Sequence, residues 1–145
     1  HVTLKHEQQQ FPGDPTIDFL RNPFYSTDFK SIFAGSITWD IDKWSTTLRG
    51  TRYGSTPNYI AWTNTDGYAA PGAGRVDPWI LYNGSVTYSI SDDMNVSFIV
   101  NNIRNSKPPK DPTWTTSPYY NYNVFNPFGR ELWLEFDWRF GRTKS

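Results

Sequence analysis

The stretch Glu131-Leu132-Trp133-Leu134-Glu135-Phe136-Asp137-Trp138-Arg139-Phe140 decides the fold class of this chain. Its even-numbered positions are all large and apolar, whereas all of its odd-numbered positions except Trp133 are charged. Side chains alternate between the two faces of a β-strand, so the stretch predicts a strand with one apolar and one polar face. This pattern is typical of a wall between lipid and a water-filled lumen.

Similar alternation recurs along the chain and predicts an all-β fold. In residues 79–91, for example, Ile80, Tyr82 and Val86 alternate with Asn83 and Ser85. Most of the predicted strands are close to the 9–11 residues that a tilted membrane strand requires. The six predicted strands span residues 2–8, 29–40, 44–54, 79–91, 94–103 and 131–140, the first being the weakest.

The connections between these strands alternate between short and long. Residues 40–43 and 91–94 form short polar turns, whereas residues 9–28, 55–78 and 104–129 form long links rich in proline and aromatic residues. Outer-membrane barrels have short periplasmic turns and longer extracellular loops. We therefore expect an antiparallel meander of about six strands within a transmembrane outer-membrane β-barrel, with the long loops extracellular and the C-terminus periplasmic.

The composition agrees with that expectation and excludes other classes. Aromatic residues make up 18% of the chain and hydrophobic residues only 37%, with a mean hydropathy of −0.66. No apolar run approaches the about 20 residues of a membrane helix. The 14 basic and 14 acidic residues balance, so the chain has no basic footprint for nucleic acid. The absence of cysteine excludes disulfides and thiol chemistry.

The number of predicted strands has a consequence for completeness. Six strands cannot close a membrane barrel, since the smallest have 8, and open sheet edges are not tolerated in hydrocarbon. The chain begins at His1 without an initiator Met or a signal-peptide core. We expect residues 1–145 to be the C-terminal part of a larger barrel, whose remaining strands are its partners.

Two segments resemble the end of TonB-dependent outer-membrane receptors. One is Val96-Ser97-Phe98-Ile99-Val100-Asn101-Asn102-Ile103, followed by Lys107-Pro108-Pro109. The other is Tyr122-Asn123-Val124-Phe125-Asn126-Pro127-Phe128-Gly129-Arg130, which leads into the last strand. The resemblance covers about residues 79–140. In the family the closing Phe is often the last residue, whereas here residues 141–145 follow Phe140.

The resemblance implies a role in nutrient uptake. Such receptors have a 22-stranded barrel with an N-terminal plug, and import a siderophore, vitamin or oligosaccharide with energy from TonB. No plug domain lies in this sequence. The implied partners are outer-membrane lipid, the remaining strands and plug, TonB through that plug, and the barrel-assembly machinery. We expect no enzymatic activity, no cofactor and no nucleic-acid partner.

The ionisable residues do not form a convincing catalytic or metal site. Glu131 and Glu135 would lie roughly 13 Å apart on one strand face, beyond the about 5–9.5 Å of a glycosidase pair. Glu135 and Asp137 are closer, but Arg139 follows them on the same face. His1 and His6 are the only histidines and lack a carboxylate cluster at ligand spacing. A lumen-facing charge ladder is the expected role of the carboxylates.

The aromatic residues are the better candidates for contact with a partner. Those in the predicted extracellular loops either contact a ligand or form the aromatic girdle at the membrane interface. The ligand-contact candidates are Trp62, Tyr68, Trp114, Tyr119 and Tyr120. The residues of the last strand predicted to face lipid are Leu132, Leu134, Phe136, Trp138 and Phe140.

Two other classes of protein fit the same alternation. One is a soluble β-sandwich carbohydrate-binding module with exposed aromatic residues. The other is a small structural or adhesive outer-membrane barrel. The sandwich predicts apolar faces packed against each other and a monomer that needs no detergent.

Overall fold

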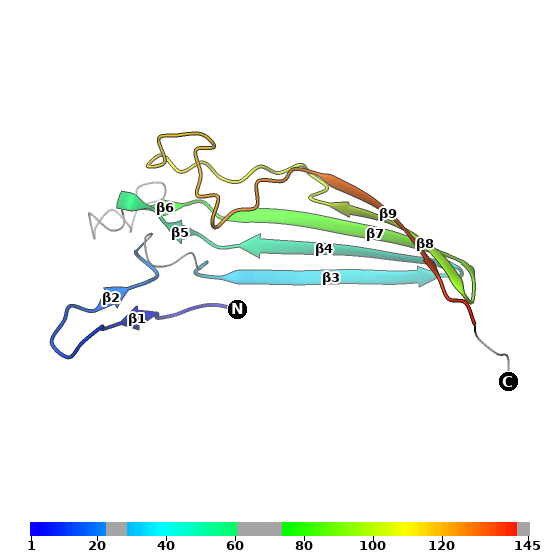
Figure 1. Cartoon of the computed structure of the whole chain (residues 1–145), viewed down its shortest axis with the longest axis horizontal. Helices are drawn as coiled ribbons and strands as arrows, with labels where there is room; N and C mark the ends of the chain where they lie inside the picture. The colour runs from blue at the N-terminus through cyan, green and yellow to red at the C-terminus, as the bar shows by residue number, and fades with distance from the viewer. Residues whose placement is uncertain (23–28, 61–73, 142–145) are drawn as a thin grey trace. The chain divides into compact units, whose positions relative to one another are not determined.

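A computed structural model describes residues 1–22, 29–60 and 74–141 of the chain (Figure 1). The named elements in these residues are all β-strands. The long strands are β3 (Ile32–Ile41), β4 (Trp44–Tyr53), β7 (Trp79–Ser91), β8 (Met94–Asn101) and β9 (Glu131–Trp138). The short strands are β1 (Glu7–Gln8), β2 (Ile17–Asp18), β5 (Thr56–Pro57) and β6 (Arg75–Val76).

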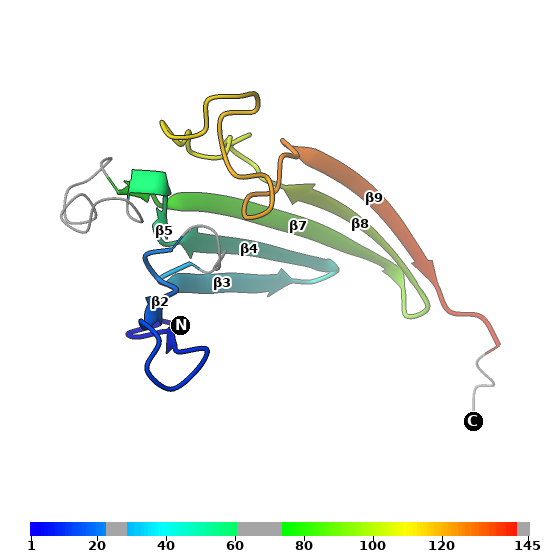
Figure 2. The same ribbon diagram turned by 60° about the vertical axis from the view of Figure 1, so that its left-hand side comes forward.

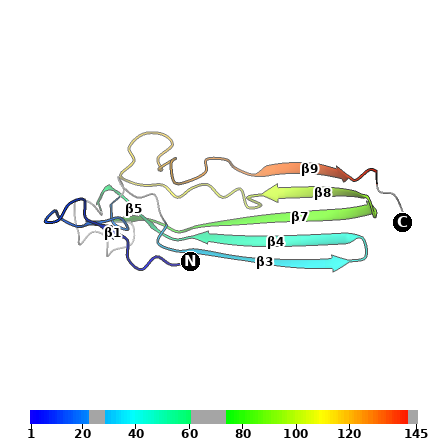
Figure 3. The ribbon, with the colours of Figure 1, turned by 60° about the horizontal axis from the view of Figure 1, so that its bottom comes forward.

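The five long strands form one sheet in the order β3-β4-β7-β8-β9, with each strand beside its neighbour in Figure 3. The all-β class and the antiparallel arrangement are therefore confirmed. Within the described ranges the sheet is open, with β3 and β9 as its outer strands, and no closed barrel is formed.

The predicted first strand, residues 2–8, differs most from the structure. Val2 forms an isolated bridge with Ser31, next to the start of β3, while Glu7 and Gln8 pair with Asp18 and Ile17 in a separate small sheet. The turn that follows at residues 11–14 folds the chain back, and its Gly13 has a φ of 99°. Proline and glycine in this turn favour a local hairpin over a continuous strand.

The chain divides into two compact units. The first consists of His1–Phe33, Arg52–Ile80 and Lys107–Pro127, and we call it the loop unit. The second consists of Ala34–Thr51, Leu81–Ser106 and Phe128–Ser145, and we call it the sheet unit.

The register of the sheet unit assigns its side chains to two faces. Val86 pairs with Phe98, and Phe98 pairs with Leu134. The Trp44 ring lies 4.6 Å from that of Tyr88, which puts the even-numbered positions of β4 on this same face. The face is apolar across all five strands. Its exposed members are Ile37, Trp39, Ile41, Trp44, Leu48, Ile90, Phe98, Leu132, Leu134, Phe136 and Trp138.

The opposite face of the sheet unit is mainly polar. The hydroxyl oxygens of Thr38 and Thr47 lie 2.8 Å apart across β3 and β4. Those of Thr87 and Ser97 also lie 2.8 Å apart, across β7 and β8. Cross-strand hydroxyl pairs of this kind stabilise a wet sheet face. The alternation predicted for these strands therefore gives two chemically different surfaces on one layer.

An asparagine turn ends β8. The N–H of Asn102 donates to Asn83 Oδ1 at 2.8 Å, and the Asn102 side chain makes two 2.8 Å bonds with the Ser106 backbone. The side chain of Asn105 then accepts from the Arg130 N–H at 3.0 Å, just before β9. Asn102 and Asn105 both have a φ of 52°, a conformation that asparagine tolerates. The strands β8 and β9 lie side by side and curve together, as Figure 2 shows.

The loop unit has a small aromatic core. Phe125, only 2% exposed, lies with its ring centroid 5.7 Å from Trp79 and 5.6 Å from Phe29. Tyr53 contacts Phe29 at 4.9 Å and Trp79 at 6.1 Å. Edge-to-face and tilted pairs at these distances are favourable. The cluster fixes the long link before β9 against the ends of β4 and β7.

The hairpin of β1 and β2 belongs to the same unit. His6 stacks on Phe19 with ring centroids 4.7 Å apart. Lys5 Nζ lies 2.9 Å from Glu7 Oε2, and that hydrogen bond raises the pKa of Lys5. Both side chains of this ion pair reach solvent, so its contribution to stability is small.

Candidate ligand cavity in the loop unit

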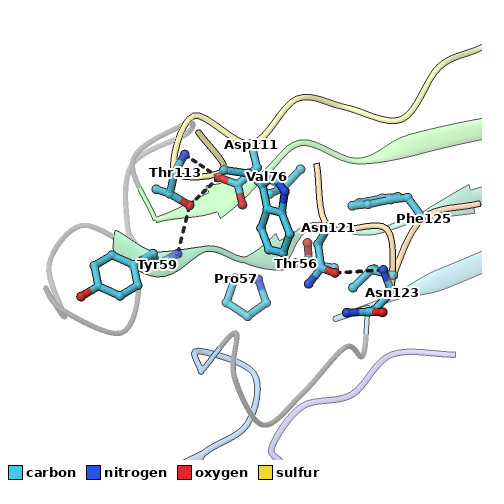
Figure 4. Close-up of a pocket in the computed structure, with 11 residues that line it drawn as sticks. Thr56, Pro57, Tyr59, Val76, Asp111, Thr113, Asn121, Asn123 and Phe125 are labelled. Carbon is cyan, nitrogen blue, oxygen red and sulfur yellow. Dashed lines mark hydrogen bonds between the residues drawn. The ribbon is translucent and has the colours of Figure 1, made fainter. Parts of the chain in front are cut away.

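A cavity of about 400 Å³ lies within the loop unit. It lies where β5 and Val76 of β6 meet the long link after β8. The residues that line it are Thr56, Pro57, Tyr59, Val76, Asp111, Thr113, Trp114, Asn121, Asn123, Val124 and Phe125. Its volume falls in the range of about 300–1,000 Å³ typical of small-molecule sites. Figure 4 draws all of these residues as sticks and labels most of them.

Asp111 is the charged residue of the cavity wall, and it is 6% exposed. Its Oδ1 atom accepts from the Thr113 N–H at 2.9 Å and from the Thr113 hydroxyl at 2.7 Å. The same hydroxyl accepts from the Tyr59 N–H at 3.4 Å, so the turn is linked to the chain that follows β5 (Figure 4). A short Asp-x-Thr turn thus fixes the carboxylate in one orientation.

A second turn supplies amide groups. The Oδ1 atom of Asn121 accepts from the Asn123 N–H at 3.0 Å, and the backbone carbonyl of Asn121 accepts from Val124 and Phe125. Because Phe125 is held in the aromatic core, this turn is fixed as well. The Trp114 ring is held by an edge contact with Tyr122, at 5.9 Å between ring centroids.

Three of the five predicted ligand-contact residues lie in the part of the chain that the structure describes, and the cavity includes one of them. Trp114 lines the cavity, whereas Tyr119 and Tyr120 lie in the same link but outside its wall. Lys110 Nζ is 6.0 Å from the centre of the Tyr119 ring. Trp62 and Tyr68 lie outside the described residues.

Sequence reasoning missed most of the cavity wall. Asp111 and Asn121 each precede a residue two positions later whose N–H they bind, and such Asx turns are a recognisable local signal. That signal marks the turns but not their meeting with β5. The contact between residue 59 and residue 113 depends on tertiary folding.

The carboxylates of the terminal strand do not meet to form a site. Glu131, Glu135 and Asp137 pair across the sheet with Asn101, Ser97 and Asn95, on the polar face. The residues predicted to face lipid in β9 are exposed on the opposite face, with Leu134 at 77%. Phe140 follows the end of β9 and is also exposed.

The described ranges contain neither a metal-ligand cluster nor a membrane-spanning helix. No group of three or more His, Cys, Asp or Glu side chains in residues 1–22, 29–60 and 74–141 is placed to hold a metal ion. Among those same residues no helix has the length and apolarity needed to cross a membrane.

Comparison of the chain with models of protein families, with curated proteins and with solved structures gave no match.

Proposed function

We propose that this chain forms part of the wall and the extracellular loops of a TonB-dependent outer-membrane receptor. In this proposal it serves uptake of a scarce ligand, which is a siderophore, a vitamin or an oligosaccharide. The last strands and their connecting segments resemble that family, and the C-terminus lies on the periplasmic side.

The observation that carries the proposal is the exposed apolar face of the sheet unit. Soluble proteins rarely expose contiguous apolar patches larger than a few hundred Å². Here large apolar side chains are exposed on each of the five long strands, β3, β4, β7, β8 and β9. Burying one such side chain stabilises a protein by about 1.5–3 kcal/mol. Contact with lipid would supply that burial, while the polar face would line water.

The two open edges of the sheet support the same proposal. The outer strands β3 and β9 each pair with one long strand of the described sheet. Unpaired backbone groups at an edge cost several kcal/mol each in hydrocarbon. A larger barrel would pair these edges with its remaining strands, so this chain would contribute one section of the wall.

Site-directed spin labelling tests the lipid assignment directly. The chain has no native cysteine, so each introduced cysteine carries the only label. In lipid vesicles, labels at Leu134→Cys and Phe98→Cys should be accessible to oxygen, which concentrates in the bilayer. Labels at Glu135→Cys and Ile99→Cys should be accessible to a water-soluble nickel chelate.

Ile99 makes this test strict, because it is apolar but lies on the polar face beside Trp133. If position 99 follows its residue type and enters lipid, the assigned faces are wrong. If all four labels are accessible to the nickel chelate and the chain stays monomeric without detergent, the soluble β-sandwich replaces the receptor. A closed small barrel from this chain alone would point to the structural or adhesive alternative.

A further inference from the structure

We propose that the cavity of the loop unit binds a neutral oligosaccharide. This inference rests on the proposed function, which makes these loops the part of the receptor that meets the ligand. Of the three ligand classes named there (siderophore, vitamin and oligosaccharide), it selects the oligosaccharide. Three features of the cavity support this ligand class, namely its free polar groups, its charge and its aromatic wall.

The cavity wall holds polar side chains that are fixed by hydrogen bonds but still have atoms available for a ligand. Asp111 uses Oδ1 for both of its side-chain hydrogen bonds, which leaves Oδ2 without a protein partner among the described residues. Among the same described residues, the side chain of Asn121 likewise forms a hydrogen bond only through Oδ1. Within that part of the chain the Asn121 amide nitrogen is therefore free to donate, while Asp111 Oδ2 is free to accept. Asn123 adds a side-chain amide to the same wall.

A sugar hydroxyl matches this set of groups. A hydroxyl donates one hydrogen bond and accepts others, so a single hydroxyl can donate to a carboxylate and accept from an amide. Hydrogen bonds to a charged acceptor are stronger than those between two neutral groups. Neighbouring hydroxyls on one ring would satisfy Asp111 and Asn121 together, and a ligand without such hydroxyls would leave them unpaired.

The charge of the cavity disfavours anionic ligands. Among the described residues that line it there is no Lys, Arg or His, and Asp111 is the charged one. Recognition of anionic groups such as carboxylates usually relies on Arg or Lys. A ferric chelate with net negative charge would meet only the carboxylate of Asp111. The described wall therefore favours an uncharged ligand over an anionic metal chelate.

The remaining wall is apolar and suits the C–H faces of sugar rings. Trp114, Pro57 and Val124 contribute apolar surface, and the Trp114 ring is held in place by Tyr122. In Figure 4 the Tyr59 ring points away from Asn121 and Asn123, and this residue is exposed. A small number of polar groups on a largely apolar wall is the usual design of a ligand pocket.

The test is a titration of the chain in detergent micelles with a panel of neutral trisaccharides. The panel contains maltotriose, cellotriose, xylotriose, mannotriose, galactotriose and triacetylchitotriose, and isothermal calorimetry measures binding. Ferric citrate and cyanocobalamin stand for the siderophore and vitamin classes. We expect saturable binding of at least one trisaccharide and no competition by the other two compounds.

Two conservative variants connect that binding to the cavity. Asp111→Asn keeps the Oδ1 acceptor for Thr113 but replaces the free oxygen by an amide, and should weaken binding about tenfold or more. Trp114→Phe keeps an aromatic edge on Tyr122 and should weaken binding about fivefold, since a smaller ring covers less of the sugar. Asp92→Asn in the β7–β8 turn and Trp133→Phe in β9 are the matched controls and should leave the affinity unchanged.

Three results would overturn the inference. They are the absence of saturable binding across the trisaccharide panel, binding that neither cavity variant weakens, and competition by ferric citrate or cyanocobalamin. Vesicle flotation of the same protein distinguishes this failure from that of the proposed function. Association with lipid without sugar binding rejects only the ligand class, whereas sugar binding without lipid association rejects the receptor and retains the sugar site.

Discussion

The loop unit and the sheet unit place their apolar side chains in opposite environments. The buried apolar side chains of the described residues are Leu20, Val76, Trp79 and Phe125, and all of them belong to the loop unit. In the sheet unit the buried side chains are polar, such as Thr51 and Asn102, while the large apolar ones are exposed. The loop unit therefore buries apolar side chains, as proteins in water usually do, whereas the sheet unit exposes them.

The contrast shows that the two units treat their apolar side chains differently. A cluster like Phe29, Tyr53, Trp79 and Phe125 buries its own apolar surface and needs no further partner. The single-layer sheet has no such means within the described residues, so its apolar face gains stability only from something outside it. Lipid is the partner that the proposed function assigns.

The largest expected effect is in the aromatic core of the loop unit. Phe125→Ala should lower the free energy of unfolding of this unit by about 3–5 kcal/mol, because it removes a buried ring and leaves a cavity. Phe11, which belongs to the same unit and is 69% exposed, provides the matched control, and Phe11→Ala should change stability by about 0.5 kcal/mol or less. Denaturant titration followed by amide exchange measures both. Equal losses in the two variants would remove the distinction between core and surface.

The next effect concerns the two faces of β9. Phe136→Arg should weaken insertion into lipid vesicles by about 2–4 kcal/mol, since it puts a charge on the apolar face. Asp137→Arg exchanges one charge for another on the polar face and should insert almost normally. Urea titration of the vesicle-bound protein measures the difference. Equal insertion of the two variants would contradict the assignment of the faces.

Two glycines sharpen the comparison between the units. In the loop unit, a Cβ at Gly54 would lie 2.5 Å from Ser31 Oγ and 2.9 Å from Ser31 backbone atoms. Gly54→Ala should therefore cost about 1–3 kcal/mol through forced backbone shifts. In the sheet unit, a Cβ at Gly35 would meet no atom within 4 Å, so Gly35→Ala should cost nothing. Thermal unfolding measures the loss of stability in both variants. An equal loss would show that the two units do not differ in close packing at these glycines.

A cost similar to that at Gly54 is expected at the turn that ends β8. Asn102→Ala removes two side-chain hydrogen bonds to Ser106 and should cost about 0.5–1.5 kcal/mol for each. The Ser106 amide should then exchange faster with solvent. Asn101→Ala, one residue earlier on β8, lacks these bonds to Ser106 and is the control. Unchanged exchange at Ser106 in Asn102→Ala would mean that the backbone alone holds the turn.

The sequence predicted the long strands well because alternation is a local signal. The limits of β7 agree with the prediction, and those of β4 differ by one residue. The prediction extended β8 to residue 103, but the positive φ of Asn102 ends the strand at Asn101. Alternation cannot detect that turn, since asparagine also fits the wet face of a strand.

The cavity could not be predicted in the same way. Its wall combines β5, β6 and the link from residue 111 to residue 125, and only the folded chain brings them together. The sequence indicates Trp114 as a ligand-contact candidate because it is aromatic and lies in a long link. Asp111 carries the stronger argument for a ligand, but its importance depends on burial and on the oxygen that its turn leaves free.

The ladder between β8 and β9 determines which kinds of sequence change this protein can accept. All of its pairs, from Met94 with Trp138 to Asn101 with Glu131, are in continuous register without a bulge. Because side chains alternate strictly, inserting one residue in β9 would exchange the faces of all residues beyond it. A single insertion at Phe136 should thus be more harmful than most substitutions there, whereas two inserted residues would restore the faces. Evolution of this strand is expected to proceed by substitution or by paired insertions, while the long links accept length changes of any parity.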